Sequence, residues 1–233
     1  MSERILIVNA DDLGASPGVN SGIVEAHTRG IVTSTSLMVH CPAASDAARL
    51  AGEHPELAVG LHWDLDSEAA RRVDLDDPVA VMTELARQLD AFRELMGRPP
   101  THVDSHHHIH REPEIDPIAR KLAAPLGVPL RGDGRVNYIG GFYGQWEHGV
   151  TDLHHVSVEF LTWILRNEVV AGWTEIGCHP GHLRGDLATT YYSEREVELA
   201  TLTDPRVRHE IDALGIRLAS YADLEPREPI LTE

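Results

Sequence analysis

The sequence contains little cysteine and almost no lysine, and each shortage excludes a class of protein. Its two cysteines, Cys41 and Cys178, are too few for a framework of disulfide bonds, and we expect both to be unpaired in a reducing cytoplasm. Lys121 is the only lysine, and 20 Lys and Arg face 37 Asp and Glu, which gives a formal net charge of −17. Because a surface this negative repels phosphate groups, we expect neither nucleic acid nor an anionic membrane as a partner.

Long apolar runs are also missing, and none reaches the length that spans a membrane. The first residues lack the basic region and apolar segment of a secretory signal peptide, so we expect a cytoplasmic protein. Hydrophobic residues still make up 42% of the 233 residues, which is enough for a folded core and excludes global disorder. Since the composition does not change along the chain and no repeat is visible, we expect one domain over residues 1–233.

Short apolar segments alternate with longer amphipathic ones along the chain. The first, residues 5–10, is β-branched and continuous, as a strand buried on both faces should be, and the longest helical pattern covers residues 77–96. Strand and helix patterns alternate about seven times, which predicts an α/β fold with a mainly parallel sheet, open or closed into a barrel. Further strands are predicted at residues 33–39, 57–61, 101–104, 128–131, 174–178 and 216–220.

One segment, residues 132–152, interrupts this alternation. It is rich in glycine and also contains tyrosine, phenylalanine and tryptophan. A long loop of this composition within a compact domain is usually functional. We therefore expect it to lie over the active site and to contribute to substrate choice; a disordered insertion is the alternative.

Aspartates and histidines gather where the predicted strands end. Asp11 and Asp12 follow the first strand, His62 follows the third, His106 opens a run of histidines after the fourth, and His179 follows a later one. In parallel α/β folds the carboxyl ends of the strands lie on one rim, so these side chains are expected to converge. Carboxylate oxygens and neutral imidazole nitrogens are the usual ligands of Zn²⁺ and similar divalent ions.

A divalent ion at this rim would acidify a bound water, so the combined pattern indicates a metal-dependent hydrolase. Each part alone has a simpler explanation, since adjacent aspartates often cap helices and single histidines are common in cores. The spacing of His106 and His110 would place both on one face of a helix, as in an i, i+4 ligand pair. These residues do not name the substrate.

The sequence resembles the YdjC-like carbohydrate deacetylases, the family that includes chitooligosaccharide deacetylase. The resemblance covers essentially the whole chain, and the combination of NADD with DSHHHIH is its most specific part. It implies a distorted or incomplete (β/α) barrel and the removal of the acetyl group from an N-acetylated amino sugar or oligosaccharide with one divalent ion, Mg²⁺ or Zn²⁺. The matching segments are residues 7–14 (IVNADDLG), 16–20 (SPGVN), 30–36 (GIVTSTS), 60–62 (GLH), 100–110 (PTHVDSHHHIH), 178–180 (CHP) and 220–223 (SYAD).

The resemblance also implies a role for each residue of the rim. Asp12, His62 and His106 would be the metal ligands, Asp11 the general base, and His179 the general acid that protonates the leaving amine. His108 and His110 belong to the family string, but only a supporting or substrate-binding role is implied for them. Five aromatic residues are candidates for stacking on a sugar ring, with packing inside the protein as the alternative: Trp63, Tyr138, Phe142, Tyr143 and Trp146.

Two other functions remain open. One is a different metal-dependent (β/α)-barrel hydrolase, such as a phosphoesterase or a non-sugar amidohydrolase; the other is a metal-binding or sugar-binding protein without catalysis. A phosphoesterase would need basic residues near the metal, and Arg131 and Arg135 are the only nearby candidates. A homodimer is expected only because such dimers are common.

Overall fold

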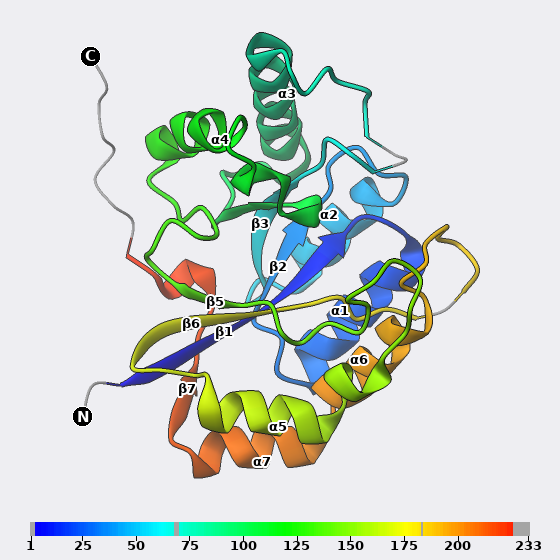
Figure 1. Ribbon diagram of the computed structural model, residues 1–233, viewed down its shortest axis with the longest axis vertical. Coiled ribbons are helices and arrows are strands. Elements are labelled where there is room, and N and C mark those ends of the chain that lie inside the picture. Colours follow the sequence, from blue (N-terminus) through cyan, green and yellow to red (C-terminus); the bar gives the residue numbers. More distant parts are fainter. Residues whose placement is uncertain (1–2, 68–69, 183, 226–233) are drawn as a thin grey trace.

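The computed structural model describes residues 3–67, 70–182 and 184–225, and the strands found there form one sheet. The strand order is β4-β3-β2-β1-β6-β5, with β7 paired to β1, and every pair is parallel (Figure 1). The result is an α/β fold with a curled, half-barrel sheet, which confirms the predicted incomplete barrel. The strands are β1 (Arg4–Leu13), β2 (Ser34–Leu37), β3 (Ala58–Trp63), β4 (Val103–Ser105), β5 (Asn137–Ile139), β6 (Gly172–Cys178) and β7 (Ile216–Leu218).

Helices connect these strands and cover the sheet. Helices α3 and α4 pack together at one end of the sheet, and α5 and α7 pack together at the other (Figure 1). No helix in the described ranges is long and apolar enough to cross a membrane. The helices are α1 (Pro17–Arg29), α2 (Ala44–Glu53), α3 (Pro78–Met96), α4 (Asp116–Ala123), α5 (Val158–Asn167), α6 (Ser193–Leu202) and α7 (Pro205–Ala213).

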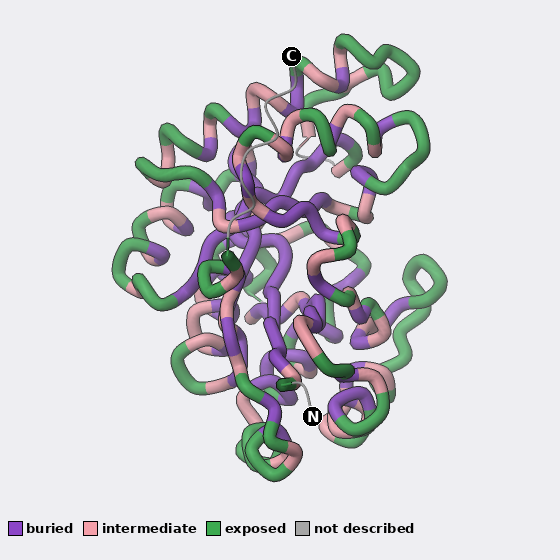
Figure 2. The backbone as a smooth tube through the Cα atoms, turned by 90° about the vertical axis from the view of Figure 1, so that its left-hand side faces the viewer, coloured by how far each residue is buried: buried purple, intermediate pink, exposed green. Residues whose placement is uncertain are grey.

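The central strand β1 shows why the sequence forms this fold. It is buried from Ile5 to Leu13 and pairs along its length with β6 on one side and with β2 and β7 on the other. A strand covered by helices on both faces needs the continuous apolar composition seen in the sequence. Figure 2 shows the same arrangement for the whole molecule, with buried backbone in the central strands and exposed backbone on the outer turns of the helices.

The longest helix, α3, agrees with its pattern in the sequence. Asp77 caps its first turn by accepting hydrogen bonds from the amides of Val79 and Ala80, and the helix ends where Gly97 adopts a φ of 64°. Its buried stripe includes Val81, Leu85, Leu89 and Phe92. Elsewhere in the described chain both cysteines are buried and free, as predicted.

The structure differs from the prediction between β4 and β5. The strand predicted at residues 128–131 is reduced to one parallel bridge between Leu130 and Val103. Gly132 and Gly134 then turn the chain with φ values of 84° and 87°, conformations that favour glycine. The short strand β5 follows, inside the segment that the sequence presents as a loop. The half-barrel is therefore interrupted here, with Leu130 beside β4 and β5 beside β6.

Candidate metal and catalytic site

Strand β1 ends in two aspartates with different partners. The Asp11 carboxylate accepts two hydrogen bonds of 2.8 Å from the guanidinium of Arg131. Asp12 has a φ of 69°, which is uncommon for a residue other than glycine, and its Oδ2 accepts a hydrogen bond of 2.7 Å from Arg195. The left-handed backbone at Asp12 therefore separates two neighbouring carboxylates into two environments.

Asp12, His62 and His106 come together from the ends of β1, β3 and β4. Asp12 Oδ1 lies 3.4 Å from His62 Nε2 and 3.3 Å from His106 Nδ1, and the three atoms lie within 4.8 Å of one another. Asp12 and His62 are buried, whereas the side chain of His106 is 22% exposed. The cluster is therefore closed on the protein side and accessible on one side.

This cluster fits a divalent ion. Asp12 Oδ1 and His62 Nε2 are buried and have no hydrogen-bond partner, which costs about 1–3 kcal/mol for each such atom. A cation between them would satisfy both atoms. In a tetrahedral zinc site with bonds of about 2.0–2.1 Å, neighbouring ligand atoms lie about 3.3 Å apart, close to the distances from Asp12 Oδ1. One carboxylate oxygen and two imidazole nitrogens are also a donor set that suits zinc and similar ions.

His62 is held in place from behind. Its Nδ1 lies 2.7 Å from Asp104 Oδ1 and 3.1 Å from Ser36 Oγ, so Nε2 is left to face Asp12. Burial lowers the pKa of His62, but the carboxylate of Asp104 outweighs it and raises that pKa well above its ordinary value. Neither Asp104 nor Ser36 was a predicted site residue, although both lie in segments that carry the family resemblance.

Arg131 connects several buried carboxylates. Its guanidinium contacts Asp11, lies 2.9 Å from Asp104 and 2.6 Å from Glu175, and Glu175 in turn accepts a hydrogen bond of 2.6 Å from Tyr221. Burial raises the pKa of Asp11, but Arg131 outweighs it, so that pKa is lowered overall. Because its guanidinium is committed to carboxylates, Arg131 is not available to bind a phosphate group.

His179 follows β6 and lies beside the buried carboxylate of Glu198. Its Nδ1 is 3.8 Å from Glu198 Oε1, and its backbone amide also donates to Glu198. Burial lowers the pKa of His179, but Glu198 raises it above the ordinary value overall. The ring centroid lies 5.5 Å from that of Tyr143 and 5.4 Å from that of Tyr191. The sequence did not point to Glu198, because its position on α6 has no motif of its own.

The histidine run does not form a regular helix, so the predicted i, i+4 pairing of His106 with His110 is wrong. His107 and His108 between them have φ values of 48° and 56°, which turn the two histidines to different partners. His110 Nδ1 lies 2.5 Å from Ser105 Oγ, and its Nε2 donates to the carbonyl of Arg131 over 2.9 Å. Burial lowers the pKa of His108 and of His110 to about 4, so both are neutral near pH 7.

The structure separates the five aromatic candidates. Trp63 and Phe142 are buried in the core and cannot stack on a sugar. Tyr138 is covered by Arg131, whose guanidinium lies 4.8 Å from the ring centroid. Tyr143 lies beside His179, and Trp146 lies beside Tyr143. Burial, and then the Asp12 carboxylate, raise the pKa of Tyr143.

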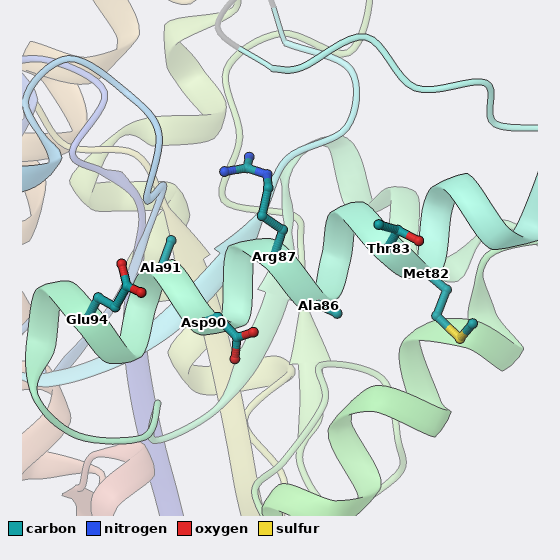
Figure 3. Close-up of a pocket in the computed structure, with 7 residues that line it drawn as sticks. All are labelled: Met82, Thr83, Ala86, Arg87, Asp90, Ala91 and Glu94. Carbon is teal, nitrogen blue, oxygen red and sulfur yellow. The ribbon is translucent and has the colours of Figure 1, made fainter.

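A separate surface hollow lies along α3 (Figure 3). It shares no residue with the Asp12 cluster, and Arg87 in its lining is already paired with Glu84. The hollow has no convergent set of acids, bases or metal ligands, so it is not a candidate for the chemistry. Its lining residues are Met82, Thr83, Ala86, Arg87, Asp90, Ala91 and Glu94.

Fold and site together define the class of this protein: an α/β protein with a half-barrel sheet and a candidate metal site, similar in fold to carbohydrate esterases. A family 4 carbohydrate esterase from Streptomyces lividans, solved in complex with acetate, superposes with a TM-score of 0.61 at 11% identity, covering 98% of this chain and 100% of that chain. A proposed cellobiose-phosphate cleavage protein from Enterococcus faecalis V583 superposes with a TM-score of 0.77 at 28% identity, covering 94% of this chain and 98% of that chain.

The chain belongs to the YdjC-like protein family, whose sequence profile matches residues 5–213. It is 36% identical to the carbohydrate deacetylase of Geobacillus stearothermophilus, in an alignment that covers 94% of this chain and 98% of that protein. It is 34% identical to the chitooligosaccharide deacetylase of Serratia marcescens, in an alignment that covers 95% of this chain and 100% of that protein. The resemblance stated from the motifs is confirmed.

Proposed function

We propose that this protein is a metal-dependent hydrolase that removes the N-acetyl group from an acetylated amino sugar or oligosaccharide. The observation that carries the proposal is the buried Asp12 cluster with Asp11 and His179 nearby. It occurs in a chain that is 36% identical, over nearly its full length, to a carbohydrate deacetylase. Hydrolysis of an amide requires activation of a water, stabilisation of an oxyanion and protonation of the amine. Asp11 is suited to the first of these steps and His179 to the last.

The metal ligands are Asp12, His62 and His106. A divalent ion held there, with Mg²⁺ and Zn²⁺ as the two candidates, would polarise the amide carbonyl and lower the pKa of a bound water. Arg195 holds the other oxygen of Asp12, which leaves Oδ1 for the ion. Asp104 fixes the ring of His62 so that Nε2 faces the same point.

Asp11 is the general base and His179 the general acid in this proposal. Arg131 keeps Asp11 ionised and fixes its orientation, so the carboxylate is available to accept a proton from the attacking water. His179, in contrast, is kept protonated, because Glu198 raises its pKa. Such a group can donate a proton to the leaving amine, which is a poor leaving group without it.

The alternatives have less support. The commitment of Arg131 to Asp11, Asp104 and Glu175, together with the pairing of Arg135 with Asp133, leaves neither predicted arginine for a phosphate group. Binding without catalysis would not require an ionised carboxylate and a histidine with a raised pKa beside the ligand cluster. We also propose a cytoplasmic location, because two buried free thiols are typical of a reducing compartment.

Acetate release is the direct test of this function. The metal-free protein is loaded with each divalent ion and given N-acetylated mono-, di- and oligosaccharides, and acetate and free amine are both measured. We expect equal amounts of acetate and amine from at least one sugar, and release slower by about 10²–10⁴-fold from the Asp11→Asn variant. Absence of acetate from every sugar and ion would refute the proposal, and release of phosphate from a sugar phosphate would favour the phosphoesterase instead.

A further inference from the structure

Trp146 is an exposed aromatic residue beside the candidate site. It is 61% exposed, more than any other aromatic side chain among the exposed large hydrophobic residues of the described chain. It belongs to residues 143–152, which we call the Trp146 loop. An exposed indole that is held in a fixed place offers an apolar face on which a ligand can stack.

Buried polar contacts fix the start of the Trp146 loop. Gln145 donates hydrogen bonds of 2.7 Å to the Thr190 carbonyl and 2.8 Å to Glu194, and Glu194 is fully buried on α6. The Gly144 amide donates to the hydroxyl of Tyr191 over 2.9 Å. The residues on both sides of the exposed indole are therefore tied to the protein interior.

The end of the loop is tied to the same carboxylate. Thr151 donates a hydrogen bond to Glu194, and the Asp152 amide donates to the Gly144 carbonyl over 2.7 Å. A side chain at Gly144 would meet Glu194 at 2.7 Å, so the loop lies directly on α6. Since a platform that is ordered before binding loses less entropy when a ligand binds, this construction suits recognition.

A row of aromatic rings links Trp146 to the candidate catalytic acid. His179 lies next to Tyr143 and Tyr191, which stack on each other at 4.6 Å with an interplanar angle of 4°. The ring of Trp146 follows 6.3 Å beyond Tyr143. Trp146 therefore stands one ring further from His179 than Tyr143 does.

We propose that Trp146 forms a second sugar-binding subsite, where the sugar ring adjacent to the N-acetylated one stacks on the exposed indole. This inference rests on the proposed function and adds to it the residue that holds the second ring of an oligosaccharide substrate. The occupant is a neutral sugar ring, because its apolar face matches an aromatic platform and because a protein with a net charge of −17 disfavours anionic ligands.

Trp163 provides a matched control. It is 49% exposed on α5 and stacks on Phe160 at 5.7 Å, so it is a similar surface tryptophan. It makes no ring contact with Tyr143 or His179 in the described chain. It is linked to Trp146 through Phe160 and His155, so it lies at the other end of the row of rings from His179 and outside the proposed subsite.

The experiment compares Trp146→Ala, Trp146→Phe and Trp163→Ala on N-acetylglucosamine and on its β-1,4-linked disaccharide. The quantity measured is the ratio of kcat/KM for the disaccharide to kcat/KM for the monosaccharide, from acetate release. We expect Trp146→Ala to lower this ratio about 3- to 10-fold, the size of one aromatic stacking contact. Trp146→Phe should restore most of it, and Trp163→Ala should leave it unchanged. Circular dichroism and the unfolding temperature establish that each variant is folded.

The ratio also separates this inference from the proposed function. If the protein releases acetate but Trp146→Ala leaves the ratio unchanged, the subsite is wrong and the function stands. If no sugar yields acetate, calorimetry with the disaccharide still tests the subsite. Loss of disaccharide binding in Trp146→Ala but not in Trp163→Ala supports the subsite, and equal binding in the two variants overturns it. A dimer that Trp146→Ala converts to a monomer, with the ratio unchanged, would make this surface a contact between two copies and overturn the inference.

Discussion

Asp11 and Asp12 are neighbours in the chain, but their partners give them different chemistry. Asp12 offers one oxygen to a cluster of imidazoles, while Asp11 is held on both oxygens by Arg131. A carboxylate that binds a divalent ion is a weaker base, because the ion engages its lone pair. Asp11 binds no ion in this assignment, and its Oδ2 accepts one hydrogen bond, from Arg131, so it keeps a lone pair for the proton of the water.

Asparagine at each position separates the two roles. Asp11→Asn should retain the metal and lose about 10²–10⁴-fold in kcat, the usual contribution of a general base. Asp12→Asn should weaken metal binding, and added metal should partly restore turnover. Kinetics of both variants at several metal concentrations test this. If metal rescues Asp11→Asn and not Asp12→Asn, the assignments are reversed, and if neither variant changes acetate release, the active site lies elsewhere.

The two predicted histidine ligands should control metal content. We expect His62→Ala and His106→Ala to lose stoichiometric metal in elemental analysis, and wild-type affinity to fall on acidification, because ligand imidazoles must be neutral. His107→Ala is the matched control, since His107 adjoins His106 but its Nδ1 faces Asp66 at 2.8 Å. Full metal content in both ligand variants would contradict the assignment.

The pH dependence of activity should depend on Glu198. Glu198 raises the pKa of His179, so the protonated acid persists to higher pH, and kcat/KM should fall as the pH rises through that pKa. Glu198→Gln removes the charge, lowers the pKa of His179 and should move the alkaline limb of the profile to lower pH. Glu159→Gln, at a side chain that is 72% exposed, should leave the profile unchanged. If the alkaline limb of the profile does not move in Glu198→Gln, Glu198 does not set the pKa of the catalytic acid.

The candidate site residues at strand ends could be predicted from the sequence, but the residues that hold them in place could not. Asp11, Asp12 and His62 follow recognisable strands, so their convergence could be predicted. Arg195 and Glu198 lie on a helix whose pattern shows only that it is amphipathic. Their contacts with Asp12 and His179 exist because α6 folds back over the ends of β1 and β6, and no local spacing encodes that approach.

At the scale of elements, a long pattern could be predicted with both of its ends, whereas a three-residue strand within a glycine-rich segment could not. Helix α3 has 19 residues, enough for its apolar stripe and its Asp77 cap to mark both ends. Strand β5 has three residues, too few for a period of two to be visible. The left-handed residues His107 and His108 are also outside any pattern of hydrophobicity, because their backbone is set by contacts of the folded chain.

Two glycines in different elements should respond oppositely to alanine. At Gly60 in β3 an added Cβ would lie 2.4 Å from the ring of His102, which stacks on Tyr221 at 3.9 Å. Gly60→Ala should therefore lower the free energy of unfolding by about 1–3 kcal/mol. Gly52 in α2 has open space around it, so Gly52→Ala should raise stability by about 0.5–1 kcal/mol. Urea denaturation measures both, and a loss at Gly52 as large as at Gly60 would contradict the steric explanation.

At the scale of the whole molecule, negative charge is concentrated inside the sheet as well as on the surface. Four of the buried carboxylates pair with the two buried guanidinium groups, which leaves an excess of 4 − 2 = 2 negative formal charges in this cluster. Burying uncompensated charge is costly, and a divalent cation would balance this excess. The carboxylates are Asp11, Asp12, Asp104 and Glu175, and the guanidinium groups are Arg131 and Arg195.

Metal removal should therefore destabilise the whole fold. An ion that binds only the folded state stabilises it by about 2.7 kcal/mol at 100 times its Kd, which raises the Tm of a protein of this size by about 5–10 °C. We expect a chelator to lower the Tm by that amount and re-added metal to restore it. Because the surface is also strongly acidic, a cation that only screened it would stabilise His62→Ala and wild type equally, and sodium chloride at matched ionic strength would have the same effect. If the site is specific, added metal should raise the Tm of the wild type and leave the Tm of His62→Ala unchanged.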